Sequence, residues 1–218
     1  MSEERVIPIF PLSIVVFPGQ SVPLHIFEER YKAMVADCSP AVPGEPFRPF
    51  GISLQMGGAV EAVGCTVAVS QIAERYADGS FDIITQAQRR YTTRQTYDDR
   101  PYLTGRVELF EDLEGGRADP SLVREVGELL RQLLELAAEE AGVEAAQVSS
   151  PPPAELDAYT VASRAGLALR QKQRLLEMRR EADRLEQLLA FLGEAIPRSR
   201  LRLDRKRRAK SNGRSREA

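Results

Sequence analysis

Residues 8–31 of the chain read PIFPLSIVVFPGQSVPLHIFEERY, short apolar runs separated by prolines. Proline cannot donate a hydrogen bond to a strand ladder, so the runs 6–10 and 13–17 are predicted to be short strands at a sheet edge or with a bulge. Pro18-Gly19 indicates a turn between such strands. We therefore expect the N-terminal part to be built from strands.

A helix is expected next, because apolar residues recur at helical spacing up to residue 38. Ser39-Pro40 should end it, since the residue before a proline avoids helical backbone. Within this stretch, Phe10, Phe17 and Phe27 are expected in the core. The apolar face of the predicted helix consists of Phe27, Tyr31, Met34, Val35 and Cys38.

Strands resume after a proline-rich loop and continue to residue 113. Residues 63–70 alternate between larger and smaller side chains, and residues 81–85 and 103–109 also form extended runs. Asp78-Gly79 indicates a hairpin, because both central positions tolerate a positive φ. Residues 1–113 are thus predicted to form a β-rich subdomain, a small barrel or folded sheet with one early helix.

Residues 117–196 are predicted to form a helical bundle after a Gly115-Gly116 joint, giving an α+β chain. Asp119-Pro120 begins the first helix and Gly142 ends it, Pro151–Pro153 is a spacer, and a short helix covers residues 155–164. Intramolecular helix packing and a dimeric coiled coil both fit the last helix, so the chain is a monomer or a weak homodimer. This last helix is expected to close at Gly193 and Pro197, and its seam is Leu175, Met178, Ala182, Leu185, Leu189 and Leu192.

The net charge of −2 hides two opposite parts. Residues 198–218 carry ten Lys and Arg against two acidic residues, a net charge of +8, which leaves −10 on residues 1–197. Residues 197–218 are therefore predicted to be a disordered basic tail, in which weak, non-specific polyanion binding would depend on Arg205, Lys206, Arg207 and Arg208.

The sequence contains few residues that could form a catalytic site. His25 is the sole histidine, and Cys38 and Cys65 are the two cysteines, expected to be buried and reduced. No metal site, no cofactor and no phosphate-binding glycine motif is expected. No apolar run is long enough to span a bilayer and the N-terminus lacks a signal sequence, so no membrane association and a cytoplasmic location are expected.

The motif P-L-x-x-x-V-F-P-G-x-x-x-P-L-H-I-F-E-x-R-Y resembles the opening of the Lon protease N-terminal domain family. The similarity covers about residues 6–193, with Glu29 and Ala87 departing from the usual Pro and Gly. The other segments that follow the family order are Phe50-Gly51-Ile52, Val63-Gly64-Cys65, Asp78-Gly79, Arg90-Tyr91, Pro101-Tyr102-Leu103 and Lys172–Glu177.

The resemblance implies a PUA-like β-barrel followed by a helical bundle, and a substrate-recognition role without an ATPase or peptidase. A non-enzymatic module is expected, binding unfolded or extended protein segments at a strand edge or at a groove between barrel and bundle, with a separate protease or chaperone as a further partner. Residues expected at the peptide site are His25, Phe27, Glu28, Arg30, Tyr31 and Arg90. The alternatives are a nucleic-acid-associated PUA-like protein acting through its tail and a hydrolase using His25.

Overall fold

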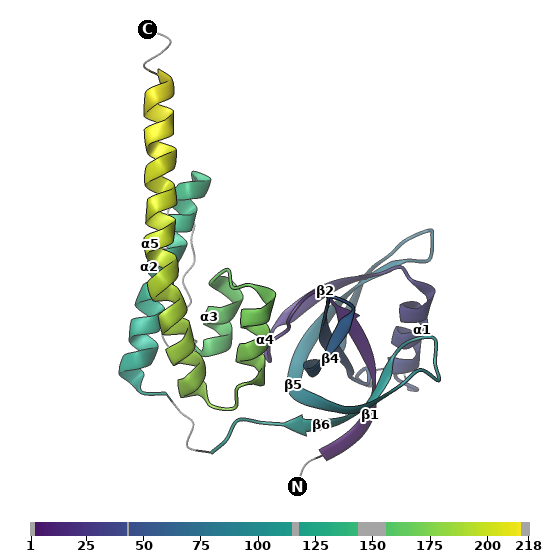
Figure 1. The fold of residues 1–218 in the computed structure, drawn as a ribbon. Coiled ribbons are helices and arrows are strands. Elements are labelled where there is room, and N and C mark those ends of the chain that lie inside the picture. The colour runs from purple at the N-terminus through teal and green to yellow at the C-terminus, as the bar shows by residue number, and fades with distance from the viewer. Residues whose placement is uncertain (1–2, 43, 115–117, 144–155, 215–218) are drawn as a thin grey trace. The chain divides into compact units, whose positions relative to one another are not determined.

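The structure is a computed structural model in which the chain forms two compact units (Figure 1). The first unit contains the strands, the helix between the second and third strands, and one helix from the later part of the chain. The second unit contains the other helices that follow the sheet. The described residues are 3–42, 44–114, 118–143 and 156–214. The units are Met1–Glu111 with Ala168–Glu177, and Asp112–Leu167 with Met178–Ala218.

One six-stranded sheet forms the first unit, in the order β2-β5-β4-β3-β1-β6. Strand β6 also pairs with β5, so five strands form a closed ring of hydrogen-bonded neighbours, and β2 is attached to the outside of this ring through β5. Only β1 and β3 pair in parallel among these strands. The strands are β1 (Glu3–Leu12), β2 (Ser21–Ile26), β3 (Phe50–Met56), β4 (Ala59–Arg75), β5 (Phe81–Tyr97) and β6 (Thr104–Phe110).

Helix α1 (Glu29–Cys38) completes the core of this unit. The predicted helix is confirmed, but its start was placed too early: Glu28 has extended backbone (ψ 134°), so Phe27 precedes the helix. Phe27 is 62% exposed, which corrects the expectation that it lies in the core, whereas Phe10 and Phe17 are buried. The helix packs Tyr31, Met34, Val35 and Cys38 into the cluster that contains Phe10 and Phe50.

One strand prediction was wrong, and another strand is longer than predicted. Residues 13–17 form no strand; Phe17 is buried, but its N–H donates to the side chain of Gln20 in a turn. Residues 81–97 form one long strand, in which register shifts against β4 and β6 interrupt the alternation of buried side chains. The hairpin at Asp78-Gly79 is confirmed, although only Gly79 has a positive φ.

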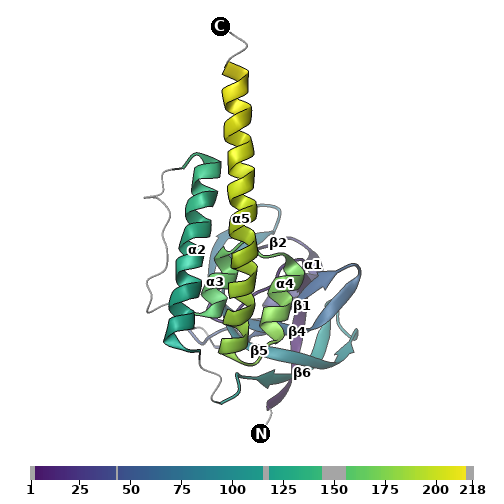
Figure 2. The same ribbon diagram turned by 60° about the vertical axis from the view of Figure 1, so that its left-hand side comes forward.

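Helices α2 (Pro120–Ala141), α3 (Ala158–Arg164) and α5 (Glu181–Arg214) form the second unit. Asp119 caps α2 by accepting from the backbone N–H of Ser121, and Gly142 ends it with a φ of 75°, as predicted. Helix α2 runs alongside α5 in both views (Figures 1 and 2). Within the described residues, none of the helices combines the length and apolar character needed to cross a bilayer. The Gly115-Gly116 joint and the Pro151–Pro153 spacer lie outside the described residues.

The predicted last helix is in fact two helices. Helix α4 (Leu169–Glu177) belongs to the first unit, and the chain leaves helical structure at residues 178–180 before α5 begins. Carbonyl groups left without a helical partner accept other donors: that of Met178 from the Arg184 guanidinium and that of Arg179 from the N–H of Leu113. These contacts stabilise a break that the continuous apolar spacing does not reveal.

Helix α5 continues through Pro197 to Arg214, so the prediction that it ends at Gly193 and Pro197 was wrong. Pro197 removes one backbone donor, but the buried face that includes Ile196 continues beyond it at Ser199 and Leu203. Farther on, Arg207 pairs with Glu139, and Lys206 donates to the carbonyl oxygen of Glu140. The basic segment predicted to be disordered is therefore helical as far as Arg214, and Lys206 and Arg207 contact the C-terminal end of α2.

Candidate functional site

Strand β2 offers an edge to other chains, because β5 is its single pairing partner among the described strands. Its exposed positions are Ser21, Pro23 and His25, and Pro23 suits an edge strand because it has no N–H to donate. Sheet edges of this kind bind extended peptides by adding a strand. The C-terminal end of β2 is therefore a candidate binding surface.

Three exposed rings meet at this end of β2, and we call His25, Phe27 and Tyr76 the aromatic surface. The ring of His25 stacks on that of Phe27 with centroids 5.7 Å apart and meets the edge of Tyr76 at the same distance. Phe27 is 62% exposed and Tyr76 39% exposed. An exposed phenyl ring held by neighbouring rings provides apolar contact area with little loss of side-chain freedom.

Asp82 on β5 forms hydrogen bonds with two of the three side chains of the aromatic surface, His25 and Tyr76. It lies opposite His25 in the β2–β5 register, with 2.6 Å between its Oδ1 and His25 Nδ1, and its Oδ2 accepts from the Tyr76 hydroxyl at 2.7 Å. The hydrogen bond from Tyr76, followed by the one with His25, holds the pKa of Asp82 below its ordinary value. The same hydrogen bond is the main reason why the pKa of Tyr76 rises to about 12. The His25 ring is thus held in place by its hydrogen bond with Asp82.

Glu28 and Arg30 lie next to this surface and pair with each other. Arg30 Nε donates to Glu28 Oε2 at 2.8 Å, although side chains two residues apart on a helix would point in different directions. The reason is again the extended backbone of Glu28, which lies before the helix. The pair gives the aromatic surface a polar border.

Tyr31 and Arg90 are buried instead of facing a ligand. Tyr31 packs against Phe10 with ring centroids 4.0 Å apart. Arg90 lies over the ring of Phe110, and its guanidinium donates to the carbonyl oxygen of Leu176 near the end of α4. These two side chains are therefore placed to pack the interior of the first unit and not to contact a peptide at its surface.

Reactive groups are buried as well. Cys38 and Cys65 are free thiols in the core, and burial is the main cause that raises the pKa of Cys38 to about 11 and that of Cys65 to about 12. Within the described part of the chain, no group of three His, Cys, Asp or Glu side chains is placed to hold a metal ion.

The comparison with protein families concerns most of the chain. Residues 6–194 match the model of the ATP-dependent protease La (LON) substrate-binding domain. The chain belongs to this family. The match covers the strands, α1 and the helices up to the middle of α5.

Among relatives of this Lon substrate-binding domain, a Lon protease from Chloroherpeton thalassium is 24% identical over 201 residues, or 87% of the chain. The chain spans 23% of the length of that relative. A Lon N-terminal domain protein from Xanthomonas campestris is 28% identical with a TM-score of 0.61, and covers 85% of this chain and 98% of its own. The N-terminal domain of a Mycobacterium avium complex Lon protease, at 21% identity, has the same TM-score and shows the same fold over 87% of this chain and 98% of its own.

The sequence motif of the Lon substrate-binding domain includes His25 and Phe27, so both were predicted as site residues. Tyr76 and Asp82 lie outside the motif and were not predicted. Both lie on the β4–β5 hairpin, about fifty residues after the motif. The available signal was the Asp78-Gly79 turn, because it sets Tyr76 at one end of the hairpin and Asp82 at the start of the returning strand.

A second polar cluster, around Asp37, is expected to make stability depend on pH. Asp37 accepts from the Tyr102 hydroxyl at 2.6 Å and from Arg100 at 2.8 Å, and these partners, Tyr102 first, hold its pKa below the ordinary value. A lowered pKa in the folded state stabilises the protein above the unfolded pKa of about 4 and loses this effect as the pH falls through the folded value.

We expect Asp37→Asn to lower the urea midpoint of unfolding at pH 7, because the amide has no charge to attract Arg100. The difference from the unaltered protein should shrink as the pH falls below about 4 and vanish once Asp37 is protonated in both states. Asp98→Asn, at an exposed position before the same loop, is the control. A difference that stays constant down to pH 2 would show that the charge of Asp37 is not the cause.

Proposed function

We propose that the chain is a protein-binding module that holds exposed or extended polypeptide segments at the aromatic surface and the edge of β2. The observation that carries the proposal is the exposed ring of Phe27, stacked on His25 at the end of an edge strand in a domain of the Lon substrate-binding family. Backbone pairing along β2 would give affinity without sequence preference, and apolar side chains of the segment would contact the rings.

The module would act without catalysis of its own. In the relative from Chloroherpeton thalassium, named a Lon protease, the matching region is under a quarter of the protein. We propose that ATP hydrolysis and peptide cleavage belong to other domains or to a separate protease or chaperone, and that this chain supplies recognition, in the cytoplasm. The closed ring of five strands supports a PUA-like barrel as its scaffold.

Phe27→Ala should weaken binding of an unfolded protein about tenfold, because truncation removes the most exposed ring of the aromatic surface. Fluorescence anisotropy with labelled, permanently unfolded casein measures the affinity. Leu201→Ala is the matched control, since Leu201 is 53% exposed on α5 and also loses an apolar side chain. Equal affinities for both variants, or equal binding of a folded protein of similar size, would contradict the proposal.

The alternative function, nucleic-acid binding through the basic tail, receives less support from the contacts of the tail residues. Of the four residues expected to bind polyanions, Lys206 and Arg207 already contact the C-terminal end of α2. A nucleic acid would have to compete with Glu139 for Arg207. Binding through the tail, including weak nucleic-acid binding, therefore stays a prediction.

A further inference from the structure

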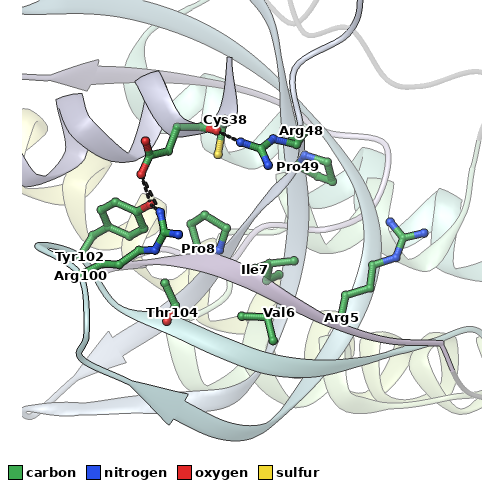
Figure 3. A pocket seen from close by; sticks show the side chains of 11 residues that line it. Arg5, Val6, Ile7, Pro8, Cys38, Arg48, Pro49, Arg100, Tyr102 and Thr104 are labelled. Carbon is green, nitrogen blue, oxygen red and sulfur yellow. Dashed lines mark hydrogen bonds and ion pairs between the residues drawn. The ribbon is translucent and has the colours of Figure 1, made fainter. Parts of the chain in front are cut away.

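A pocket of about 320 Å³ lies beside β1 in the first unit (Figure 3). Residues Arg5–Pro8 of β1 form one wall, and Arg48 and Pro49, just before β3, form another. Its volume lies at the lower end of the range for ligand sites, which suits a short piece of chain. The pocket is separate from the aromatic surface, since the two share no residue. The other lining residues are Asp37, Cys38, Arg100, Tyr102 and Thr104.

The backbone of β1 has an unpaired edge along this pocket. Strand β3 pairs with β1 at Ile9–Leu12, and the described register between them stops there, whereas β6 pairs with the other side from Glu3 to Pro8. Neither Pro8 nor Pro49 has an N–H that could extend the β1–β3 ladder. The two strands therefore separate where the pocket begins.

The direction of the Val6 backbone follows from the ladder. The N–H of Ile9 donates to the carbonyl oxygen of Leu103, on the β6 side. Opposed residues of an antiparallel pair alternate between bonded and non-bonded, so Ile7 and Arg5 also bond toward β6. Val6 then turns both its N–H and its C=O toward the edge that β3 leaves open. Its side chain is 64% exposed.

The charge of the lining selects the kind of chain that would fit. Arg5, Arg48 and Arg100 line the pocket, and Asp37 is the one acidic residue that does. Asp37 already accepts from Arg100 and Tyr102. Since residues 1–197 carry a net charge of −10, this group of arginines differs from the rest of the body. A positive pocket in an acidic body favours a negatively charged partner.

We infer that the open edge of β1 binds a short, extended, acidic segment of another polypeptide. The segment pairs with the Val6 backbone as an added strand, and its carboxylates contact Arg48 and Arg100. The inference rests on the proposed function only in that the ligand is again a polypeptide. The two sites differ in chemistry, because β2 offers aromatic rings and β1 offers guanidinium groups.

Val6→Pro tests the backbone pairing. Proline removes the N–H that points into the pocket and leaves the β1–β6 hydrogen bonds intact, because Val6 stands at a non-bonded position. Binding of a fluorescent peptide of alternating Glu and Thr should weaken about three- to tenfold. Val6→Thr keeps the N–H and is the matched control. Arg48→Gln should weaken the same peptide about two- to fivefold, less so at high salt.

The peptide itself supplies a test that needs no altered protein. N-methylation of every second residue blocks pairing along one edge and should weaken binding, whereas the version with Lys for Glu should not bind. Equal affinity for methylated and plain peptides, or for Val6→Pro and Val6→Thr, would overturn strand addition. Tighter binding of polyphosphate or RNA than of the peptide would overturn the choice of a polypeptide ligand.

Phe27→Ala separates the two sites. It should leave the affinity for the acidic peptide unchanged. Casein is itself acidic, so its binding is measured with excess acidic peptide occupying the β1 edge, and under this condition Val6→Pro should leave casein binding unchanged. If Phe27→Ala alone weakens the acidic peptide, this inference fails while the proposed function stands. If acidic peptide binding follows Val6 and casein binding ignores Phe27, the proposed function fails while this inference stands.

Discussion

Gly64→Ala is expected to destabilise the first unit by about 3 kcal/mol or more, beyond the usual cost of overpacking. A Cβ on Gly64 would lie 2.4 Å from the hydroxyl oxygen of Tyr91 and 2.5 Å from the carbonyl oxygen of Ile52. The backbone oxygen cannot move without disturbing the β3–β4 ladder. Chemical denaturation, followed by circular dichroism because the chain has no tryptophan, measures the loss.

The reason is the way in which Tyr91 packs. Its ring, fully buried, extends from β5 across Gly64 on β4 to Gly51 on β3, and its hydroxyl pairs with Ser53 at 2.8 Å. All three atoms nearest to a Cβ on Gly51 belong to the Tyr91 ring or hydroxyl. The two glycines thus leave a groove that the ring fills.

A comparison of double variants separates the two clashes. Tyr91→Ala should relieve most of the effect of Gly51→Ala, but it should relieve Gly64→Ala only in part, because the contact with Ile52 remains. Gly193→Ala is the control: nothing lies within 4 Å of its Cβ, and alanine in a helix should stabilise by up to about 1 kcal/mol. If Gly51→Ala, Gly64→Ala and Gly193→Ala had similar stabilities, the packing of Tyr91 would not explain why glycine stands at residues 51 and 64.

This packing also shows what the sequence can and cannot predict about the fold. Asp119, Pro120 and Gly142 predicted both ends of α2 because capping is a contact between near neighbours. Gly51 and Gly64 stood out only as parts of a family motif. Their physical role depends on Tyr91, which is 27 residues after Gly64 and 40 residues after Gly51, so no local pattern reveals it.

The break between α4 and α5 illustrates the same limit. Apolar residues keep helical spacing across residues 178–180, so periodicity predicts one helix. The break is stabilised by Leu113 and Arg184, whose donors come from outside that stretch or from the next helix. At the candidate site, likewise, the motif was enough to predict His25 and Phe27. Their partners on the β4–β5 hairpin could be identified only once the register of the strands was known.

Arg184→Leu is expected to destabilise the second unit by about 3 kcal/mol. The side chain is 2% exposed, donates to Asp112 and Glu181, and lies over the ring of Tyr159, 4.5 Å from its centroid. Burial lowers the pKa of a guanidinium, but the hydrogen bonds to the two carboxylates outweigh it, so the pKa of Arg184 lies above its ordinary value. Leucine would leave both carboxylates without their cation, which is the costly way to break a buried ion pair.

Arg131→Leu is the matched control because Arg131 also lies between two carboxylates, Glu128 and Glu135. That side chain is 46% exposed on α2, so its removal should cost under about 1 kcal/mol. Arg184→Lys should fall between the two leucine variants, since lysine restores the charge but cannot donate to both acids and to the Met178 carbonyl as the guanidinium does. Equal unfolding midpoints for the two leucine variants would show that Arg184 stabilises the break no more than a surface ion pair does.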